Sequence, residues 1–166
     1  MVELLAERLG ERFKKVRFNA LEVAEAKDGE VRLWLARPLT YMNVSGPPAA
    51  SFAKKHDIPP ERVIAVHDEI DLPFGALKLK TGGGTAGHRG LDSLAQALRD
   101  TGFHRMRMGV GRPPGRQDPA DFVLDAFSKR ERDEAEVLIE EAADAVLTLV
   151  REGLQGAQDR HNRTGR

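Results

Sequence analysis

Residues 82–90 read Gly-Gly-Gly-Thr-Ala-Gly-His-Arg-Gly, and this glycine loop separates a strand-like segment from a helix-like one. Before it, Gly75–Lys80 alternates apolar and basic residues, which predicts a strand with one buried face. After it, the apolar spacing of Leu91–Leu98 predicts a helix. Ordering a glycine costs roughly 0.5–1 kcal/mol more than ordering alanine. Five glycines in nine residues therefore suggest a loop that is shaped for a ligand.

The rest of the chain continues this alternation of strands and helices. Val63–Val66 is an uninterrupted apolar run, which is typical of a strand buried on both faces in a mostly parallel sheet. We predict a single α/β domain over residues 1–166, with a twisted, mostly parallel or mixed sheet flanked by helices. The other predicted elements are helices over Val2–Arg12 and Ala49–His56, strands over Ala20–Ala26, Val31–Ala36 and His104–Gly109, and a long helix from a capping box at Ser128 to Gly153.

Composition excludes several classes of protein. The 166 residues include no cysteine, which rules out disulfides, cysteine nucleophiles and thiolate metal sites. No segment approaches the roughly 20 apolar residues of a membrane span. The amino terminus also lacks the pattern of a signal peptide. We therefore expect a cytoplasmic protein with no membrane partner.

Basic residues are concentrated in the middle of the chain, although the formal net charge is zero. Gly75–Gln117 contains eight basic and two acidic residues, a local excess of 8 − 2 = +6, so the remainder carries −6. Within it, His104–Gly109 alternates methionines on one predicted face with Arg105 and Arg107 on the other. Such a basic face fits an enzyme that contacts a polyanion, and charge alone supports a solvated surface equally well.

The glycine loop matches a nucleotide-binding pattern only in part. Gly82, Gly84 and Gly87 satisfy the spacing G-x-G-x-x-G of dinucleotide-binding folds. The next predicted strand, however, ends in the sequence Gly-Val-Gly-Arg, without the acidic residue that would bind a ribose. No Gly-Lys-Ser/Thr closes a P-loop either. We predict no nucleotide cofactor.

Two polar residues stand out as candidates for chemistry. Asp68 follows the apolar run Val63–Val66, at the strand end where open α/β sheets bind ligands, and is a candidate base or orienting group. Glu69 and Asp71 could complete a cation site, but acids at a strand end more often form turns and caps, so we predict no metal. His88 lies among glycines, and we expect it to be accessible and to contact substrate rather than to pack within the loop.

Four motifs follow one another along the chain. They are Tyr-Met-Asn-Val-Ser-Gly at 41–46, His-Asp-Glu-Ile-Asp-Leu-Pro at 67–73, the glycine loop with Gly-His-Arg-Gly-Leu at 87–91, and Phe-His-Arg-Met-Arg-Met-Gly-Val-Gly at 103–111. In order and spacing they resemble the motifs of bacterial peptidyl-tRNA hydrolases, and the resemblance covers essentially the whole chain. It implies a monomeric α/β protein that hydrolyses the ester between a peptide and the terminal ribose of tRNA, without a metal or cofactor.

The resemblance also implies roles for individual residues. Asp68 matches the aspartate that holds a catalytic histidine in its basic form, and Asn43 matches an asparagine that contacts the substrate backbone and helps to orient the attacking water. A carboxylate on the far nitrogen fixes the tautomer of a histidine and raises its basicity. The implied substrate-binding residues are Tyr41, Met42, Asn43, His88 and Arg89, and the implied contacts to the 5′ phosphate of tRNA are Lys80 and Arg107, assisted by Lys78.

Two departures from the family pattern change these expectations. Arg89 stands where the family commonly has a substrate-binding asparagine; it can still donate hydrogen bonds, or it can reach a phosphate. The family also begins with a strand, an Asn-Pro-Gly turn and a Thr-Arg-His-Asn segment that carries the catalytic histidine, and the 166 residues contain no counterpart. We therefore expect an N-terminally shortened domain, in which Met1 marks a start assigned too late or the protein was shortened.

Two other functions stay open at this point. The first is an RNA-binding protein on the same scaffold, inactive for lack of its base, like the plant organellar splicing factors that resemble the family. The second is an enzyme in which His88 replaces the missing base.

Overall fold

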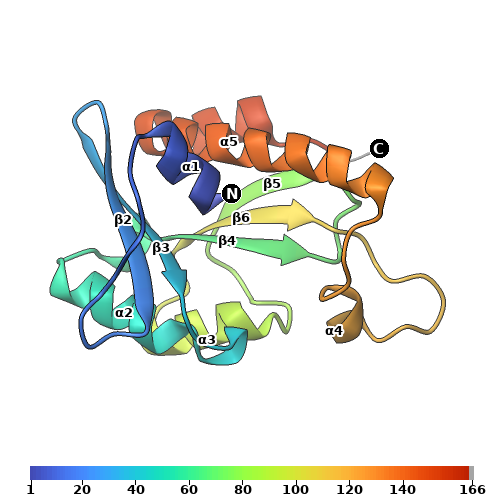
Figure 1. The fold of residues 1–166 in the computed structure, drawn as a ribbon, viewed down its shortest axis with the longest axis horizontal. Helices are drawn as coiled ribbons and strands as arrows, with labels where there is room; N and C mark the ends of the chain where they lie inside the picture. Colours follow the sequence, from blue (N-terminus) through green and yellow to red (C-terminus); the bar gives the residue numbers. More distant parts are fainter. Residues whose placement is uncertain (165–166) are drawn as a thin grey trace. The chain divides into compact units, whose positions relative to one another are not determined.

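The computed structural model describes residues 1–164 and shows an α/β fold with sheets flanked by helices (Figure 1). This confirms the predicted fold class. The chain divides into two compact units, which we call the hairpin unit, Val2–Ala65 with Thr81–His104, and the long-helix unit, Val66–Lys80 with the chain from Arg105 onward. A single domain over residues 1–166 stays a prediction. In the described part of the chain, no helix combines the length and apolarity that a membrane span requires.

The hairpin unit is built on a three-stranded antiparallel sheet in the order β1-β2-β3. Strands β2 (Leu21–Asp28) and β3 (Val31–Pro38) form the predicted hairpin, and β1 (Lys14–Lys15) adds a short edge strand that the sequence pattern did not reveal. Strand β2 packs on the helix α2 (Gly46–Lys55) through Leu21, Val23 and Phe52, with Val16, Trp34, Ala36 and Ile58 packed around them.

Two helices of this unit begin or end elsewhere than predicted. Helix α1 (Val2–Arg8) ends before Arg12 because Gly10 adopts a positive φ of 73°, and the Glu11 amide then closes the helix by donating to the Ala6 carbonyl. Helix α2 (Gly46–Lys55) begins before Ala49, because its two prolines lie in the first turn, where a missing N–H is tolerated.

The second sheet has the strand order β4-β6-β5, so the strands form two sheets rather than the one we predicted. Its strands are β4 (Ile64–Glu69), β5 (Leu77–Thr81) and β6 (His104–Gly109). The His104 amide donates to Val63 O and the Val110 amide donates to Glu69 O, which makes β4 and β6 parallel. The Gly82 amide donates to Phe103 O and the Gly109 amide to Ala76 O, which makes β5 antiparallel to β6.

The predicted strand at Val63–Val66 is half-buried, not buried on both faces. The reason is its place in the sheet: β4 lies at one end of the order β4-β6-β5 among the described residues, and only the central strand has a neighbour on each side. The predicted alternation in β5 is confirmed, because Leu77 and Leu79 are buried while Lys78 and Lys80 are partly exposed.

The carboxy-terminal helix protects the outer edge of β5. Helix α5 (Lys129–His161) begins at the predicted capping box, in which the Ser128 hydroxyl accepts from the Glu131 amide and the Glu131 carboxylate accepts from the Ser128 amide. It runs along β5 in Figure 1. Gly153 breaks the helical geometry with φ 80° and ψ 180°, which confirms the predicted stop, and a second helical segment that the sequence pattern did not reveal follows it to His161.

Side chains and backbone at the end of α5 then satisfy the polar groups of β5. The Leu79 amide donates to Asn162 Oδ1 at 2.7 Å, and Gln158 Nε2 donates to the Leu79 carbonyl at 2.8 Å. Leu77 and Arg163 exchange two backbone hydrogen bonds. The edge of β5 is thereby covered, which removes a site for unwanted strand pairing. The short helix α4 (Pro119–Phe122) precedes α5.

Candidate active site

The hairpin unit brings the one-turn helix η1 (Met42–Val44) against the start of helix α3 (Arg89–Leu98). Gly90 makes this approach possible. A Cβ atom at residue 90 would lie 2.9 Å from Met42 Cγ and 3.1 Å from His88 Cε1, closer than side chains normally pack. The predicted substrate-binding residues Met42 and His88 therefore lie side by side.

The polar and aromatic side chains of this group are presented to solvent. Tyr41 is 85% exposed and Met42 48% exposed, and Asn43 and Arg89 are also exposed. The turn that carries them is held by its own backbone, because Ser45 donates from both its amide and its hydroxyl to the Met42 carbonyl. A fixed turn with exposed amide and aromatic groups is suited to contacting a ligand.

Packing between α2 and α3 supports this arrangement from behind. The Gly46 amide, at the start of α2, donates to Ser93 Oγ at 2.9 Å in a buried hydrogen bond. A Cβ atom at residue 46 would lie 2.7 Å from the Leu94 backbone nitrogen and closer still to the Ser93 carbonyl. Because the obstructing atoms are backbone, only glycine permits the two helices to pack so closely.

His88 acts as the N-cap of α3, which differs from the accessible side chain that we expected. Its Nδ1 atom accepts a hydrogen bond from the Leu91 amide at 3.2 Å, so Nδ1 carries no proton and the neutral ring is protonated at Nε2. The Nε2 atom is itself buried. A ring whose lone pair is occupied in this way is poorly placed to accept a proton from water, which argues against His88 as the replacement base.

The glycine loop itself is tied to α3. The Thr85 hydroxyl donates to the Asp92 carboxylate, and the His88 amide donates to the Thr85 carbonyl at 3.0 Å. The loop that first suggested a ligand site therefore leads directly into the cap of α3 and its contact with η1.

The long-helix unit gathers a second group, in which a carboxylate on β4 pairs with a cation on β6 and a further cation lies on β5. Arg107 on β6 donates from Nε to Glu69 Oε2 on β4 at 3.0 Å. Burial lowers the pKa of Lys80 on β5, the charges of Arg105 and Arg107 lower it further, and Glu69 raises it. The predicted phosphate ligands Lys80 and Arg107 are thus brought together, and Lys78 lies two positions from Lys80 on the same strand.

Arg105 is the exception to the predicted basic surface, because its side chain is buried and the residue is only 2% exposed. Burial, and then the charge of Arg107, lower the pKa of its guanidinium. The alternating pattern of His104–Gly109 could not reveal this, since Arg107 occupies an equivalent position of the same strand and is partly exposed. One guanidinium of the predicted basic face, that of Arg105, is therefore buried inside the protein.

Asp68 lies in the last part of β4, half-buried. Successive residues of a strand point to opposite faces, so Asp68 and Glu69 face opposite sides of the sheet. Asp68 accepts at its backbone carbonyl from His67 Nδ1 at 2.7 Å. The predicted site residues thus fall into two sets, with Tyr41–Asn43, His88 and Arg89 in the hairpin unit and Asp68, Lys78, Lys80 and Arg107 in the long-helix unit.

The two acids that we weighed as metal ligands are occupied by arginines. Glu69 pairs with Arg107, and Asp71 pairs with Arg112. Over residues 1–164, no group of three or more potential ligand side chains is close enough together to hold a metal ion.

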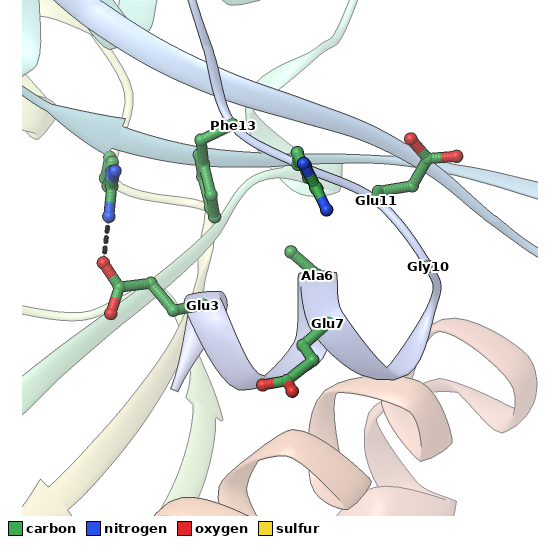
Figure 2. Close-up of a pocket in the computed structure, with 8 residues that line it drawn as sticks. Glu3, Ala6, Glu7, Gly10, Glu11 and Phe13 are labelled. Carbon is green, nitrogen blue, oxygen red and sulfur yellow. Dashed lines mark hydrogen bonds and ion pairs between the residues drawn. The ribbon is translucent and has the colours of Figure 1, made fainter.

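A pocket of about 570 Å³ lies elsewhere on the hairpin unit and is lined by none of the predicted site residues (Figure 2). Glu3 and Glu7 of α1 stand on one side of it and Phe13 on the other. Arg37 pairs with Glu3 and places its guanidinium 4.6 Å from the centre of the Phe13 ring. Two charged side chains of the pocket lining, Arg37 and Glu3, therefore pair with each other.

Residues 1–166 match the family model of peptidyl-tRNA hydrolase over the full chain. The chain belongs to the peptidyl-tRNA hydrolase family. It is 49% identical over 159 residues to the peptidyl-tRNA hydrolase of Nocardia farcinica, covering 96% of this chain and 82% of the relative. It is 50% identical over 162 residues to that of Frankia casuarinae, covering 98% and 82%.

Solved structures of peptidyl-tRNA hydrolases share this fold. The crystal structure of the Acinetobacter baumannii protein superposes with a TM-score of 0.91 at 31% sequence identity, covering 98% of this chain and 83% of that one. Sequence reasoning had already pointed to the family. It missed Glu69 as the carboxylate that pairs with Arg107; the signal available for it was its position directly after Asp68.

Proposed function

We propose that this protein binds the acceptor end of peptidyl-tRNA and hydrolyses the ester between the peptide and the terminal ribose. The proposal is supported most by the grouping of η1 with the start of α3, which gathers the residues that match the substrate-binding positions of the family to which the chain belongs. A second support is that Lys80 and Arg107 lie on the neighbouring strands β5 and β6.

In the proposed reaction, water attacks the ester carbonyl, the new bond forms between the water oxygen and the carbonyl carbon, and the ribose oxygen leaves with a proton. Asn43 holds the peptide backbone beside the ester and orients the water through its amide. Asp68 fixes the orientation of the histidine that accepts the proton from water. An ester needs little more than a positioned water, a base and hydrogen-bond donors for the developing oxyanion.

Lys80 and Arg107, with help from Lys78, hold the 5′ phosphate of the tRNA in this proposal. Contacts of this kind carry affinity and register but do not read sequence, which suits an enzyme that accepts many tRNAs. Arg89, exposed at the start of α3, reaches a phosphate or donates to the substrate in place of the family's asparagine.

We also propose that the catalytic base comes from an opening segment that lies outside these 166 residues. Two observations support this. The Nδ1 lone pair of His88 already accepts the hydrogen bond that caps α3. The relatives also contain residues without a counterpart here, since 96% of this chain but only 82% of the Nocardia protein is aligned. A monomeric state, a cytoplasmic location and the absence of a cofactor stay predictions.

The test compares the 166-residue chain with a longer chain translated from the same reading frame upstream of Met1. Each is incubated with peptidyl-tRNA, and ester cleavage and tRNA binding are measured together. We expect both chains to bind and only the longer one to cleave rapidly. Binding without cleavage by either chain would favour the alternative, an RNA-binding protein without catalytic activity. A stop codon upstream, with no sequence for Asn-Pro-Gly or Thr-Arg-His-Asn, would contradict the missing segment.

The phosphate contact has its own test. Affinity for tRNA with and without a 5′ phosphate is measured for the wild type and for Arg107→Ala at several salt concentrations. We expect removal of the phosphate to weaken the wild type more than the variant, and the variant to show a shallower salt dependence. Arg99→Ala serves as a control, because it removes an arginine from the other unit.

A further inference from the structure

Two nearly fully exposed aromatic rings lie at the same end of the β2–β3 hairpin. Phe18 is 93% exposed and Tyr41 is 85% exposed. Leu21 pairs with Pro38 at the open end of the hairpin, and the Leu39 amide donates to the Ala20 carbonyl at 3.0 Å just beyond it. Because Phe18 shortly precedes this pair and Tyr41 shortly follows it, the hairpin carries both rings at one end.

Phe18 is held in this position by a strained but well-fixed turn. Its φ of 59° lies in the left-handed region, which is unfavourable for an aromatic residue. The turn is fixed by hydrogen bonds from the Val16 amide to Leu21 O at 2.9 Å and from Asn19 Nδ2 to Pro48 O at 3.1 Å. An exposed ring on a strained turn adds nothing to the core, so a binding role is the better explanation.

The surroundings of Phe18 are basic. The Arg17 guanidinium lies 4.6 Å from the centre of the Phe18 ring, and Lys14 and Lys15 are exposed on the edge strand β1. Among the residues that the structure describes, neither lysine forms an ion pair with an acid. Glu22, which lies opposite Lys15 in the sheet, is instead bound by Arg37 at 2.7 Å. Lysines protect edge strands from pairing, which explains the two lysines but not the ring.

We propose that Arg17, Phe18, Leu39 and Tyr41 form an aromatic ledge that stacks an unpaired base of the single-stranded 3′ end of tRNA. The inference rests on the proposed function, and it adds a contact beside η1 that the family motifs do not include. Flat rings among uncompensated cations fit RNA, because every base offers a face for stacking and every nucleotide a phosphate. A peptide of variable sequence does not offer a flat ring and a negative charge at every residue.

The stacking role of Phe18 is tested with the variant Phe18→Asn. This substitution removes the ring, and asparagine tolerates the left-handed backbone. Affinity is measured by fluorescence anisotropy for two deacylated RNA hairpins of one acceptor-stem sequence, one with the unpaired 3′ nucleotides and one blunt. We expect Phe18→Asn to raise Kd for the first hairpin roughly 5- to 150-fold, the range that corresponds to one stacked base. Binding of the blunt hairpin is expected to stay unchanged.

Two controls accompany this variant. Phe18→Tyr keeps the ring and should bind like the wild type. Val137→Ala trims an exposed apolar side chain of α5 and should change neither affinity. Thermal unfolding of each variant shows that the fold is retained.

The outcomes separate this inference from the proposed function. A wild type that prefers the unpaired 3′ end, with the same preference in Phe18→Asn, would overturn the ledge and leave the proposed function standing. Equal weakening toward both hairpins would also overturn the ledge. A third hairpin that carries a peptidyl ester at its 3′ end is measured as well, and a loss seen only with this hairpin would overturn the ledge and assign the ring to the peptide. A wild type that binds neither hairpin would overturn both proposals.

Discussion

Replacing Gly46 with alanine tests how the two helices behind the candidate site are held together. A Cβ atom there would lie 2.7 Å from the Leu94 backbone nitrogen and closer still to the Ser93 carbonyl, so α2 must move away from α3. Overpacking of this kind costs about 1–3 kcal/mol. Loss of the buried 2.9 Å hydrogen bond from the Gly46 amide to Ser93 Oγ costs about 1 kcal/mol. The better helix propensity of alanine offsets up to about 1 kcal/mol.

The expected net loss for Gly46→Ala is therefore about 2 kcal/mol, or roughly 4–8 °C in Tm. Trp34, the single tryptophan, contacts Phe52 of α2 with ring centroids 6.5 Å apart and so reports on this packing. Urea unfolding followed by its fluorescence measures the change. Gly84→Ala is the matched control, since a Cβ atom there meets nothing within 4 Å. Equal stability of the two variants would contradict the claim that a side chain at residue 46 forces α2 away from α3.

Three further predictions concern the long-helix unit. Glu69→Gln should lower the pKa of Lys80, because the carboxylate now raises it; a titration of the labelled lysine by NMR checks this. Asn162→Ala should destabilise the protein by about 1 kcal/mol by leaving a strand amide at the β5 edge without its acceptor, as denaturant unfolding would show. Ser128→Ala should cost about 1 kcal/mol as a lost helix cap and should return the lowered pKa of Glu131 toward its usual value. The stabilisation from Glu131 is present above its unfolded-state pKa and lost as pH falls through its folded-state pKa, so the variant should depend less on pH in acid.

Features with a local cause could be predicted from the sequence. The hairpin follows from Asp28-Gly29, whose glycine has a φ of 59°, and the start of α5 follows from the Ser128 capping box. The burial of Leu77 and Leu79 follows from strand alternation. Turn, cap and strand-alternation preferences depend on only a few neighbouring residues, so they can be recognised without knowing the rest of the fold.

Features that depend on sheet order could not be predicted in the same way. Arg105 and Arg107 lie on the same central strand β6 and have the same alternating neighbours, yet only Arg105 is fully buried. The division of the strands into two sheets likewise depends on contacts between distant segments. The capping role of His88 could not be predicted for another reason: histidine is not among the common N-cap residues, so no sequence signal marked it as one.

The members of the candidate site stay predictions, and the sequence did not indicate how they are grouped. Motif matches named Asn43, Lys80 and Arg107, whereas the structure adds the contact of η1 with α3 and the pairing of Glu69 with Arg107. The aromatic ledge could not be predicted from the sequence. Phe18 and Tyr41 come to the same end of the hairpin only through the pairing of β2 with β3.

The most direct test of the account is the rate of ester cleavage of peptidyl-tRNA by the chain extended upstream of Met1, measured beside its Asp68→Asn variant. If Asp68 orients the base, the extended chain should cleave and the variant should be slower by roughly 10²- to 10⁴-fold with little change in tRNA affinity. Equal rates in the two proteins, or no cleavage by the extended chain although it binds tRNA, would contradict the proposed mechanism.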